Sequence, residues 1–217
     1  MRPWRDVVRQ VCEARAKAES RMMWGLPPEV PPPYNYRLEH VRAVVTLAGR
    51  LARELGADEE VVEAAAWLHD IAKGTSHDGD GHHGQQGARE VPGILADTAF
   101  PPHKVPPVCD AVVKHVGLTR EPGTPPLEPL EAAILWDADK LSKLGYTAVL
   151  HFSRASLAYS EAHTTDEAIR QNRDWFAMNR AIAASLNTPL AREMGAARAA
   201  RFETFCEHLA REWAGLE

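Results

Sequence analysis

The sequence has little cysteine, no long hydrophobic run and no excess of basic residues, and each absence excludes a class of protein. Cys12, Cys109 and Cys206 lie far apart, so neither a disulfide framework nor a thiolate zinc site is expected. Apolar runs such as residues 64–68 are far shorter than the roughly 18 residues of a membrane-spanning helix. The net charge of -5 and the pI of about 6.1 do not favour nucleic acid as the main partner.

The first residues are charged and include no apolar segment of the kind that targets proteins for secretion. Together with the sparse cysteines, this predicts a cytoplasmic protein without a membrane partner. The 217 residues, 45% hydrophobic and 25% charged, are typical of a globular chain that buries a sizeable core.

Helical periodicity dominates the chain, and no stretch alternates between apolar and polar residues as a half-buried strand would. The fold class is therefore predicted to be all-α. The expected helices cover residues 4–23, 36–55, 59–73, 83–92, about 103–117 and 130–151, with two more between 164 and 213 that are separated at 187–189. Glycine- and aspartate-rich residues 74–81 and proline-rich residues 26–33 and 121–129 are expected to be loops.

Polar residues interrupt the apolar faces of several expected helices. His40, His69, His115 and Asp139 each continue an apolar stripe at helical spacing, and Asp70 can reach the same point as His69 from the same turn. One such histidine is more often a hydrogen-bonded core residue. Burying several imidazoles and carboxylates is costly unless the carboxylates are paired or coordinate a metal. Imidazole and carboxylate without thiolate form the ligand set of Mn, Fe, Co, Ni or Zn.

These residues belong to an ordered series of short motifs. The series consists of Arg37-Leu38-Glu39-His40, Trp67-Leu68-His69-Asp70-Ile71-Ala72-Lys73, His83-Gly84-Gln85-Gln86-Gly87-Ala88, Val113-Lys114-His115 and Asp137-Ala138-Asp139-Lys140-Leu141. It resembles the HD-domain (His-Asp) metal-dependent phosphohydrolase superfamily, including its small bacterial hydrolases. The resemblance covers about residues 34–145, and the order H…HD…H…H…D is that of the two-metal members.

The resemblance implies a helical bundle with a metal-binding core over residues 34–150. An N-terminal helix and proline-rich linker, residues 1–33, precede this core. Additional helices over residues 151–217 are expected to pack on it, and the protein is expected to be a monomer or a homodimer.

The resemblance also implies a role for each matching residue. His40, His69, Asp70 and Asp139 correspond to the four ligands that the whole superfamily shares. His83 and His115 correspond to the pair that holds a second ion, in which case Asp70 bridges the two. Lys73 corresponds to a lysine that can meet a phosphate oxygen as a point charge. One or two divalent ions are therefore expected.

Two of these positions have a neighbour of the same residue type. His82 is an alternative to His83, although the glycine and glutamines that follow favour His83. Asp137 is an alternative to Asp139. Side chains two positions apart on a helix point about 200° away from each other, so only one of the two carboxylates can be a ligand. The carboxylate that precedes Lys-Leu in the family favours Asp139.

On this resemblance the expected activity is that of a metal-dependent phosphohydrolase. It would cleave a phosphoester or phosphoanhydride bond of a small phosphorylated substrate, a nucleotide foremost, with metal-activated water. The catalytic groups would be Asp70, Lys73, His83, His115 and Lys140. No Walker loop or Gly-x-Ser-x-Gly elbow is present in the sequence.

Three alternatives remain at this stage. A diiron oxygenase of the HD fold would use the same ligands, and a degenerate HD module would sense a nucleotide without turnover. A helical bundle with hydrogen-bonded core histidines would bind no metal.

Overall fold

The computed structural model describes residues 1–74, 82–159 and 164–216. Within these residues the chain forms α-helices and one short 3-10 helix, with a single isolated bridge between Arg2 and Thr98. The predicted all-α class is confirmed. The elements are α1 (Trp4–Met23), α2 (Tyr36–Leu55), α3 (Glu59–Leu68), α4 (His83–Leu95), η1 (Pro102–Lys104), α5 (Val105–Lys114), α6 (Leu130–Leu141), α7 (Tyr146–Tyr159), α8 (Thr165–Asp174), α9 (Phe176–Ala184) and α10 (Pro189–Trp213).

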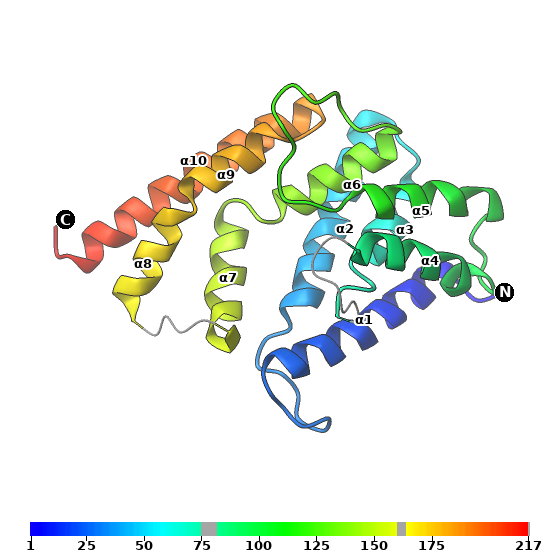
Figure 1. The fold of residues 1–217 in the computed structure, drawn as a ribbon, viewed down its shortest axis with the longest axis horizontal. Coiled ribbons are helices and arrows are strands. Elements are labelled where there is room, and N and C mark those ends of the chain that lie inside the picture. Colours follow the sequence, from blue (N-terminus) through cyan, green and yellow to red (C-terminus); the bar gives the residue numbers. More distant parts are fainter. Residues whose placement is uncertain (75–81, 160–163, 217) are drawn as a thin grey trace.

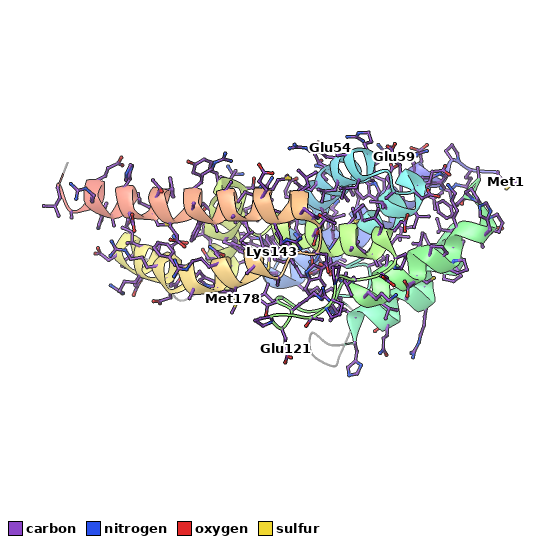
Figure 2. All side chains as sticks on the ribbon, turned by 90° about the horizontal axis from the view of Figure 1, so that it is seen from above. Met1, Glu54, Glu59, Glu121, Lys143 and Met178 are labelled. Carbon is purple, nitrogen blue, oxygen red and sulfur yellow. The ribbon has the colours of Figure 1, made fainter. Side chains whose placement is uncertain are left out.

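The helices form two groups along the longest axis of the molecule, with the two termini at opposite ends (Figure 1). In one group, α2 packs on α3 and α6, α5 packs on α3, α4 and α6, and α1 lies against α2, α3 and α4. In the other group, α10 runs beside α9 and α8 and reaches α6 and α7. Figure 2 shows Lys143 near the centre of the molecule, between the C-terminal helices and the rest of the chain. None of the described helices is long and apolar enough to span a membrane.

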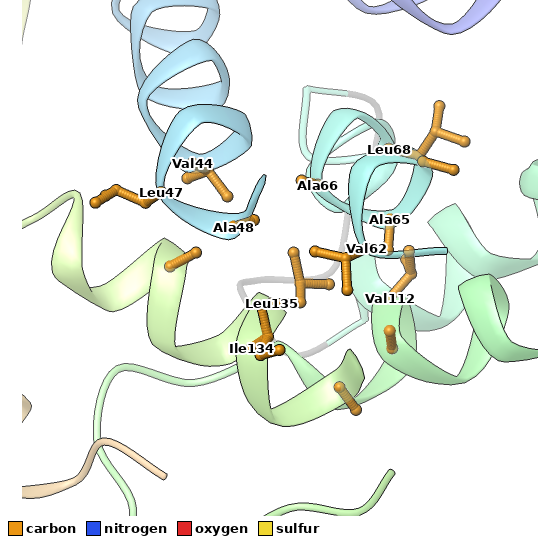
Figure 3. Close-up of a cluster of buried hydrophobic side chains, with 14 of the residues drawn as sticks. Val44, Leu47, Ala48, Val62, Ala65, Ala66, Leu68, Val112, Ile134 and Leu135 are labelled. Atoms are coloured by element: carbon orange, nitrogen blue, oxygen red, sulfur yellow. The ribbon is translucent and has the colours of Figure 1, made fainter. Parts of the chain in front are cut away.

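The core lies where α2, α3, α5 and α6 meet (Figure 3). Its side chains are fully buried aliphatic residues at helical spacing, so one stripe of each helix faces the others. They include Val44, Ala48, Val62, Ala65, Val112, Ile134 and Leu135. The polar residues singled out in the sequence continue these same stripes, and the core therefore leads directly into the candidate site.

The boundaries of α2 and the start of α3 follow from local capping. Asn35 accepts a hydrogen bond from the backbone N–H of Leu38 and so caps α2. Gly56 ends α2 in the left-handed conformation, at φ 73°. The Asp58 carboxylate then accepts from two backbone N–H groups of the first turn of α3. The range predicted for α2 is the one observed.

The prediction of one helix through Lys73 was wrong, because α3 ends at Leu68. The turns that follow close through bonds from Ile71 N to Leu68 O and from Lys73 N to Asp70 O. These bonds span three residues, which is tighter than the α-helical pattern. His69 and Asp70 therefore occupy a turn rather than a helix interior.

The prediction that the fourth helix fades at Pro92 was also wrong, because α4 continues to Leu95. Proline cannot donate to the carbonyl four residues earlier, which is that of Ala88. The Cys109 thiol of α5 lies 3.4 Å from this carbonyl oxygen and donates to it instead. The neighbouring helix thus satisfies the acceptor that proline leaves open.

The single helix predicted over residues 130–151 is two helices, α6 and α7. Gly145 separates them at φ 76°, in the left-handed region that favours glycine. An added Cβ there would lie 3.2 Å from the Cβ of Arg198 on α10, so the close approach of α10 also requires glycine.

The predicted break at residues 187–189 is observed, but the segment before it forms two helices instead of one. The chain turns at Trp175, between α8 and α9. This turn brings Phe176 against Phe202 of α10, with ring centroids 5.8 Å apart. The loop predicted over residues 74–81 lies almost entirely outside the described residues.

Candidate metal centre

Six buried side chains from five elements converge in two groups of potential metal ligands. The first group is His40, His69 and Asp139, and the second is Asp70, His83 and His115. Within each group, one ligand atom from each residue lies within 4.8 Å of the others. All six residues implied by the family resemblance are thus brought together.

In the first group, the atoms that face one another are imidazole Nε2 atoms and a carboxylate oxygen. His40 Nε2 lies 3.3 Å from His69 Nε2 and 3.2 Å from Asp139 Oδ1. His40 comes from α2, Asp139 from α6, and His69 from the turn after α3. The packing of these elements therefore fixes the distances between the three groups.

Asp70 lies between the two groups and turns one carboxylate oxygen towards each. Its Oδ2 lies 3.6 Å from His40 Nε2 and 3.5 Å from His69 Nε2. Its Oδ1 lies 3.4 Å from Nε2 of both His83 and His115, which are themselves 3.1 Å apart. A single carboxylate is therefore placed to bridge two adjacent positions.

Hydrogen bonds fix the tautomers of three of these histidines. Nδ1 of His69 lies 2.8 Å from Ala66 O, and Nδ1 of His115 lies 2.6 Å from Val112 O. A carbonyl oxygen only accepts, so each Nδ1 carries the proton and each Nε2 presents a lone pair when the ring is neutral.

Ser142 fixes His40 in the same tautomer, with the proton on Nδ1. The Ser142 hydroxyl donates to Asp139 O at 2.7 Å, and its oxygen therefore accepts from His40 Nδ1 at 3.0 Å. The Nε2 atoms of His40 and His69 then face each other as two buried acceptors with no proton between them. A cation bound between these two nitrogens would accept both lone pairs and remove their repulsion. In metal-binding imidazoles, the other ring nitrogen typically makes a hydrogen bond that orients the ring.

The spacing of these atoms also fits a metal ion. Ligand atoms about 2.1 Å from one ion lie about 3.0 Å apart at octahedral right angles and about 3.4 Å apart at tetrahedral corners. Separations of 3.1 to 3.4 Å within the two groups fall in this range. The distances of 3.6 and 3.5 Å from Asp70 Oδ2 to the Nε2 atoms of His40 and His69 lie just above it. With nitrogen and oxygen ligands and no thiolate, the centre can hold divalent Mn, Fe, Co, Ni or Zn.

Burial keeps the imidazoles neutral and ready to coordinate. It lowers the pKa of His40 to about 4 and that of His69 to about 3, and it also lowers the pKa of His115. Burial raises the pKa of Asp70, but the Arg37 guanidinium beside it outweighs this effect and holds the pKa well below its ordinary value. The imidazoles of His40, His69 and His115 and the carboxylate of Asp70 are thus in their metal-binding protonation state near pH 7.

These shifts predict that the metal-free protein loses stability in mild acid. An imidazole in the unfolded chain binds a proton near pH 6.5, whereas folded His40 and His69 bind one only near pH 4 and 3. The unfolded chain therefore binds more protons in between, and the free energy of unfolding falls as the pH drops below about 6.5. We expect a loss of about 1.4 kcal/mol per pH unit for each imidazole that stays neutral when folded.

Urea unfolding of chelator-treated protein between pH 8 and pH 5 measures this slope. In a His69→Gln variant, the slope should be smaller by the contribution of that ring. A free energy of unfolding that stays constant from pH 7 to pH 5 would contradict the prediction.

Three lysines surround the carboxylates. Lys140 donates to His115 O at 2.8 Å, pairs with Asp139 Oδ2 and lies 4.1 Å from the ring centroid of Trp136. Its side chain is 1% exposed. Lys143 pairs with Asp139 Oδ1. Lys73 lies 3.9 Å from Asp70 Oδ1 and is 32% exposed, so it is the one of the three with most access to solvent.

The structure distinguishes His83 from His82, and Asp139 from Asp137, as potential metal ligands. His83 is the first residue of α4 and is buried in the second group, whereas His82 is exposed. The carboxylate of Asp137 faces away from both groups. It accepts from the backbone and side chain of Asn187 at 2.6 and 3.0 Å, and from those of Thr188 at 2.8 Å each. Asp137 thus anchors the start of α10.

Sequence reasoning gave no role to four residues that support the ligands: Glu19, Arg37, Ser142 and Lys143. Arg37 precedes His40 by three positions and so lies on the same face of α2, a signal that was present in the sequence. Lys143 follows Asp139 by four positions in the same way. Glu19 and Ser142 gave no such signal, because the side chains that they contact, Arg37 and His40, lie 18 and 102 residues away in the sequence.

The helical bundle and its two His/Asp groups, which could hold metal ions, are the arrangement of an HD domain. Residues 37–144, half of the chain, match the family model of the HD domain, and the chain belongs to the HD-domain superfamily. The resemblance predicted from the sequence is confirmed.

Solved structures with the same fold include Bacillus subtilis YpgQ, 17% identical with a TM-score of 0.66, which matches 98% of this chain and 100% of YpgQ. An HD-superfamily hydrolase from Bacillus thuringiensis is 18% identical with a TM-score of 0.60, and covers 95% of this chain and 98% of its own. A predicted HD-superfamily hydrolase from an uncultured Thermotogales bacterium is 23% identical with a TM-score of 0.56, and covers 92% of each chain.

Sequence relatives include ribonuclease Y of Clostridium perfringens, which is 35% identical over 105 residues. That match covers 48% of this chain but 18% of the ribonuclease. Ribonuclease Y of Treponema denticola is 42% identical over 50 residues, which are 23% of this chain and 10% of that protein. The chain therefore spans less than a fifth of the length of these relatives.

Proposed function

We propose that this protein is a metal-dependent phosphohydrolase that acts on a small phosphorylated substrate. The observation that carries this proposal is the placement of Asp70, whose two oxygens face two adjacent groups of buried potential ligands. Adjacent divalent ions suit reactions at phosphorus, because both the attacking and the leaving oxygen need charge stabilisation.

The chain's own residues take distinct roles in this proposal. His40, His69 and Asp139 would hold one ion and His83 and His115 the other, with the Asp70 carboxylate available to both. Ions bound there supply Lewis acidity and lower the pKa of water. Lys73 meets a phosphate oxygen, because it is close to Asp70 and accessible. Lys140 is buried among protein acceptors and therefore positions Asp139 instead of meeting substrate.

A nucleotide is the substrate class we favour. YpgQ, which shares the fold, was crystallised in complex with ADP. RNA is a second candidate, since the sequence relatives are ribonucleases Y and a phosphodiester calls for the same chemistry at phosphorus. The net charge of -5 favours the small substrate, because binding to a polyanion generally relies on a basic surface.

The first test is the metal content of protein purified without an affinity tag or chelator. We expect about two ions per chain by elemental analysis, and about one in the His83→Ala and His115→Ala variants. One ion in the wild type would still support the proposal of a hydrolase, and His83 and His115 would then be available for acid–base catalysis. No bound ion after reconstitution with Mn or Fe would overturn the proposal in favour of a structural bundle.

The second test measures phosphate and pyrophosphate release from nucleoside mono-, di- and triphosphates, with end-labelled single-stranded RNA in parallel. We expect nucleotide turnover by the Mn-loaded protein. In Lys73→Met, kcat/KM should fall about tenfold or more with unchanged metal content, because a phosphate contact is lost. The matched control is Lys17→Met, which removes an exposed lysine of α1.

Other outcomes of the same experiment would identify the alternatives. Cleavage of RNA without nucleotide turnover would indicate that the protein is a nuclease. Nucleotide binding without turnover would indicate a sensing module. Oxygen consumption by the ferrous protein with an organophosphonate or polyol, and no hydrolysis, would indicate a diiron oxygenase.

A further inference from the structure

We propose that Glu19 of α1 and Arg37 of α2 are positioning residues that hold the bridging carboxylate of Asp70 in the orientation that serves both metal positions. Through this pair, a helix outside the matched HD domain becomes part of the metal centre. The inference rests on the metal centre proposed above, but its test measures metal affinity and not the turnover of substrate.

The contacts form a continuous chain from α1 to the centre. Arg37 Nε lies 2.9 Å from Glu19 Oε2, and Arg37 Nη2 lies 2.8 Å from Glu19 Oε1. The remaining terminal nitrogen, Nη1, pairs with Asp70 Oδ2. The planar guanidinium thus binds Glu19 with one edge and directs its remaining amino group at the bridging carboxylate.

The Arg37 guanidinium contacts both of these carboxylates. Its side chain is 11% exposed, and Asp70 is 3% exposed. A buried guanidinium needs compensation, and two carboxylates supply it. Because both edges are engaged and buried, Arg37 is poorly placed to bind a substrate phosphate. Its effect on the site therefore passes through Asp70.

Packing alone does not fix Asp70 on the side that faces α1. A cavity of about 20 Å³ lies there, lined by Cys12, Arg15, Glu19, Arg37, Asp70 and other residues. Such a volume holds at most about one water molecule, and it removes van der Waals contacts from this side. The ion pair with Arg37 is thus the directional restraint that keeps Oδ2 towards the first group and Oδ1 towards the second.

Glu19 is itself held in place by the segment that carries the His-Asp pair. An added Cβ at Gly74 would lie 3.2 Å from Glu19 Cβ and 3.3 Å from Glu19 Cγ. The stem of Glu19 therefore rests on the backbone just beyond Lys73. Glycine at this position lets α1 approach closely enough for the carboxylate to reach Arg37.

The test compares Mn²⁺ affinity in Glu19→Gln with that of Glu13→Gln. Glu13 is the matched control, because it also lies on α1 and pairs with an arginine of α2, Arg42, at 3.5 Å on the exposed surface. Isothermal titration of chelator-treated protein with Mn²⁺ gives the Kd of each ion. Loss of an orienting partner of a ligand typically weakens metal binding about 10- to 100-fold.

We expect this loss in Glu19→Gln and wild-type affinity in Glu13→Gln. Glu19→Asp keeps the charge but shortens the reach, and we expect an intermediate loss. This variant separates positioning from a simple change in net charge. Thermal unfolding of the metal-free variants separates it from a structural role, which would lower Tm without changing either Kd.

Unchanged Kd values in Glu19→Gln, with two ions still bound, would overturn the inference and leave the proposed hydrolase intact. Absence of Mn²⁺ binding in the wild type would instead overturn the metal centre itself. The two failures are therefore distinguishable within one series of titrations.

Discussion

The Asp70→Asn variant should lose both metal ions and essentially all hydrolytic activity. The amide keeps the shape of the side chain but removes the negative charge that faces both groups of potential ligands. Each group then depends on its remaining ligands, and the second group retains no carboxylate. Metal ions contribute several kcal/mol to the stabilisation of such transition states, so the expected loss of kcat/KM is about a thousandfold or more.

Elemental analysis and nucleotide turnover measure the two effects in the same preparation. The matched control is Asp110→Asn, which neutralises a partly exposed carboxylate of α5 that pairs with Lys114. Circular dichroism establishes that both variants keep their helices. Two tightly bound ions in Asp70→Asn would contradict the bridging role.

Replacing Asp137 with alanine should unfold the protein at lower temperature without emptying the metal centre. The carboxylate is fully buried and accepts four hydrogen bonds from Asn187 and Thr188. Its removal leaves four donors without their acceptor, at a cost of about 3 kcal/mol. For a chain of this length, that corresponds to a decrease in Tm of roughly 10 °C.

The comparison with Asp139→Ala makes this prediction specific. Asp139→Ala should lose at least one ion, whereas Asp137→Ala should keep the metal content of the wild type. Differential scanning calorimetry of the chelator-treated variants, with elemental analysis before treatment, measures both. The interpretation of Asp137 as an anchor fails if Asp137→Ala loses metal while its Tm stays at the wild-type value.

The sequence predicted the fold class and the burial of several of the ligand residues, because both depend on helical periodicity. His40, His115 and Asp139 continue apolar stripes, and a stripe on a helix must face the core. The resemblance to the HD-domain superfamily then indicated which polar residues belong together. Periodicity within single helices thus predicted the burial of these side chains, and the resemblance predicted that they share a site.

The errors arose where a residue has its effect through a partner from another helix. Pro92 reads as a helix end, but the Cys109 thiol satisfies the carbonyl that proline leaves open. Gly145 reads as an ordinary helix position, but the approach of Arg198 and its positive φ make it a break. The contact of Glu19 with Arg37 spans 18 residues and the proline-rich linker, and no periodic pattern reports it.

In the metal centre proposed above, the place of Asp70 between both groups makes the two metal positions unequal in evolution. A lineage that loses His83 or His115 still keeps a complete set of four ligands around the first position, with Asp70 among them. A lineage that loses Asp70 impairs both positions at once. Mononuclear descendants of this architecture should therefore retain the first position, and the second should be the one that evolution can discard or reinvent.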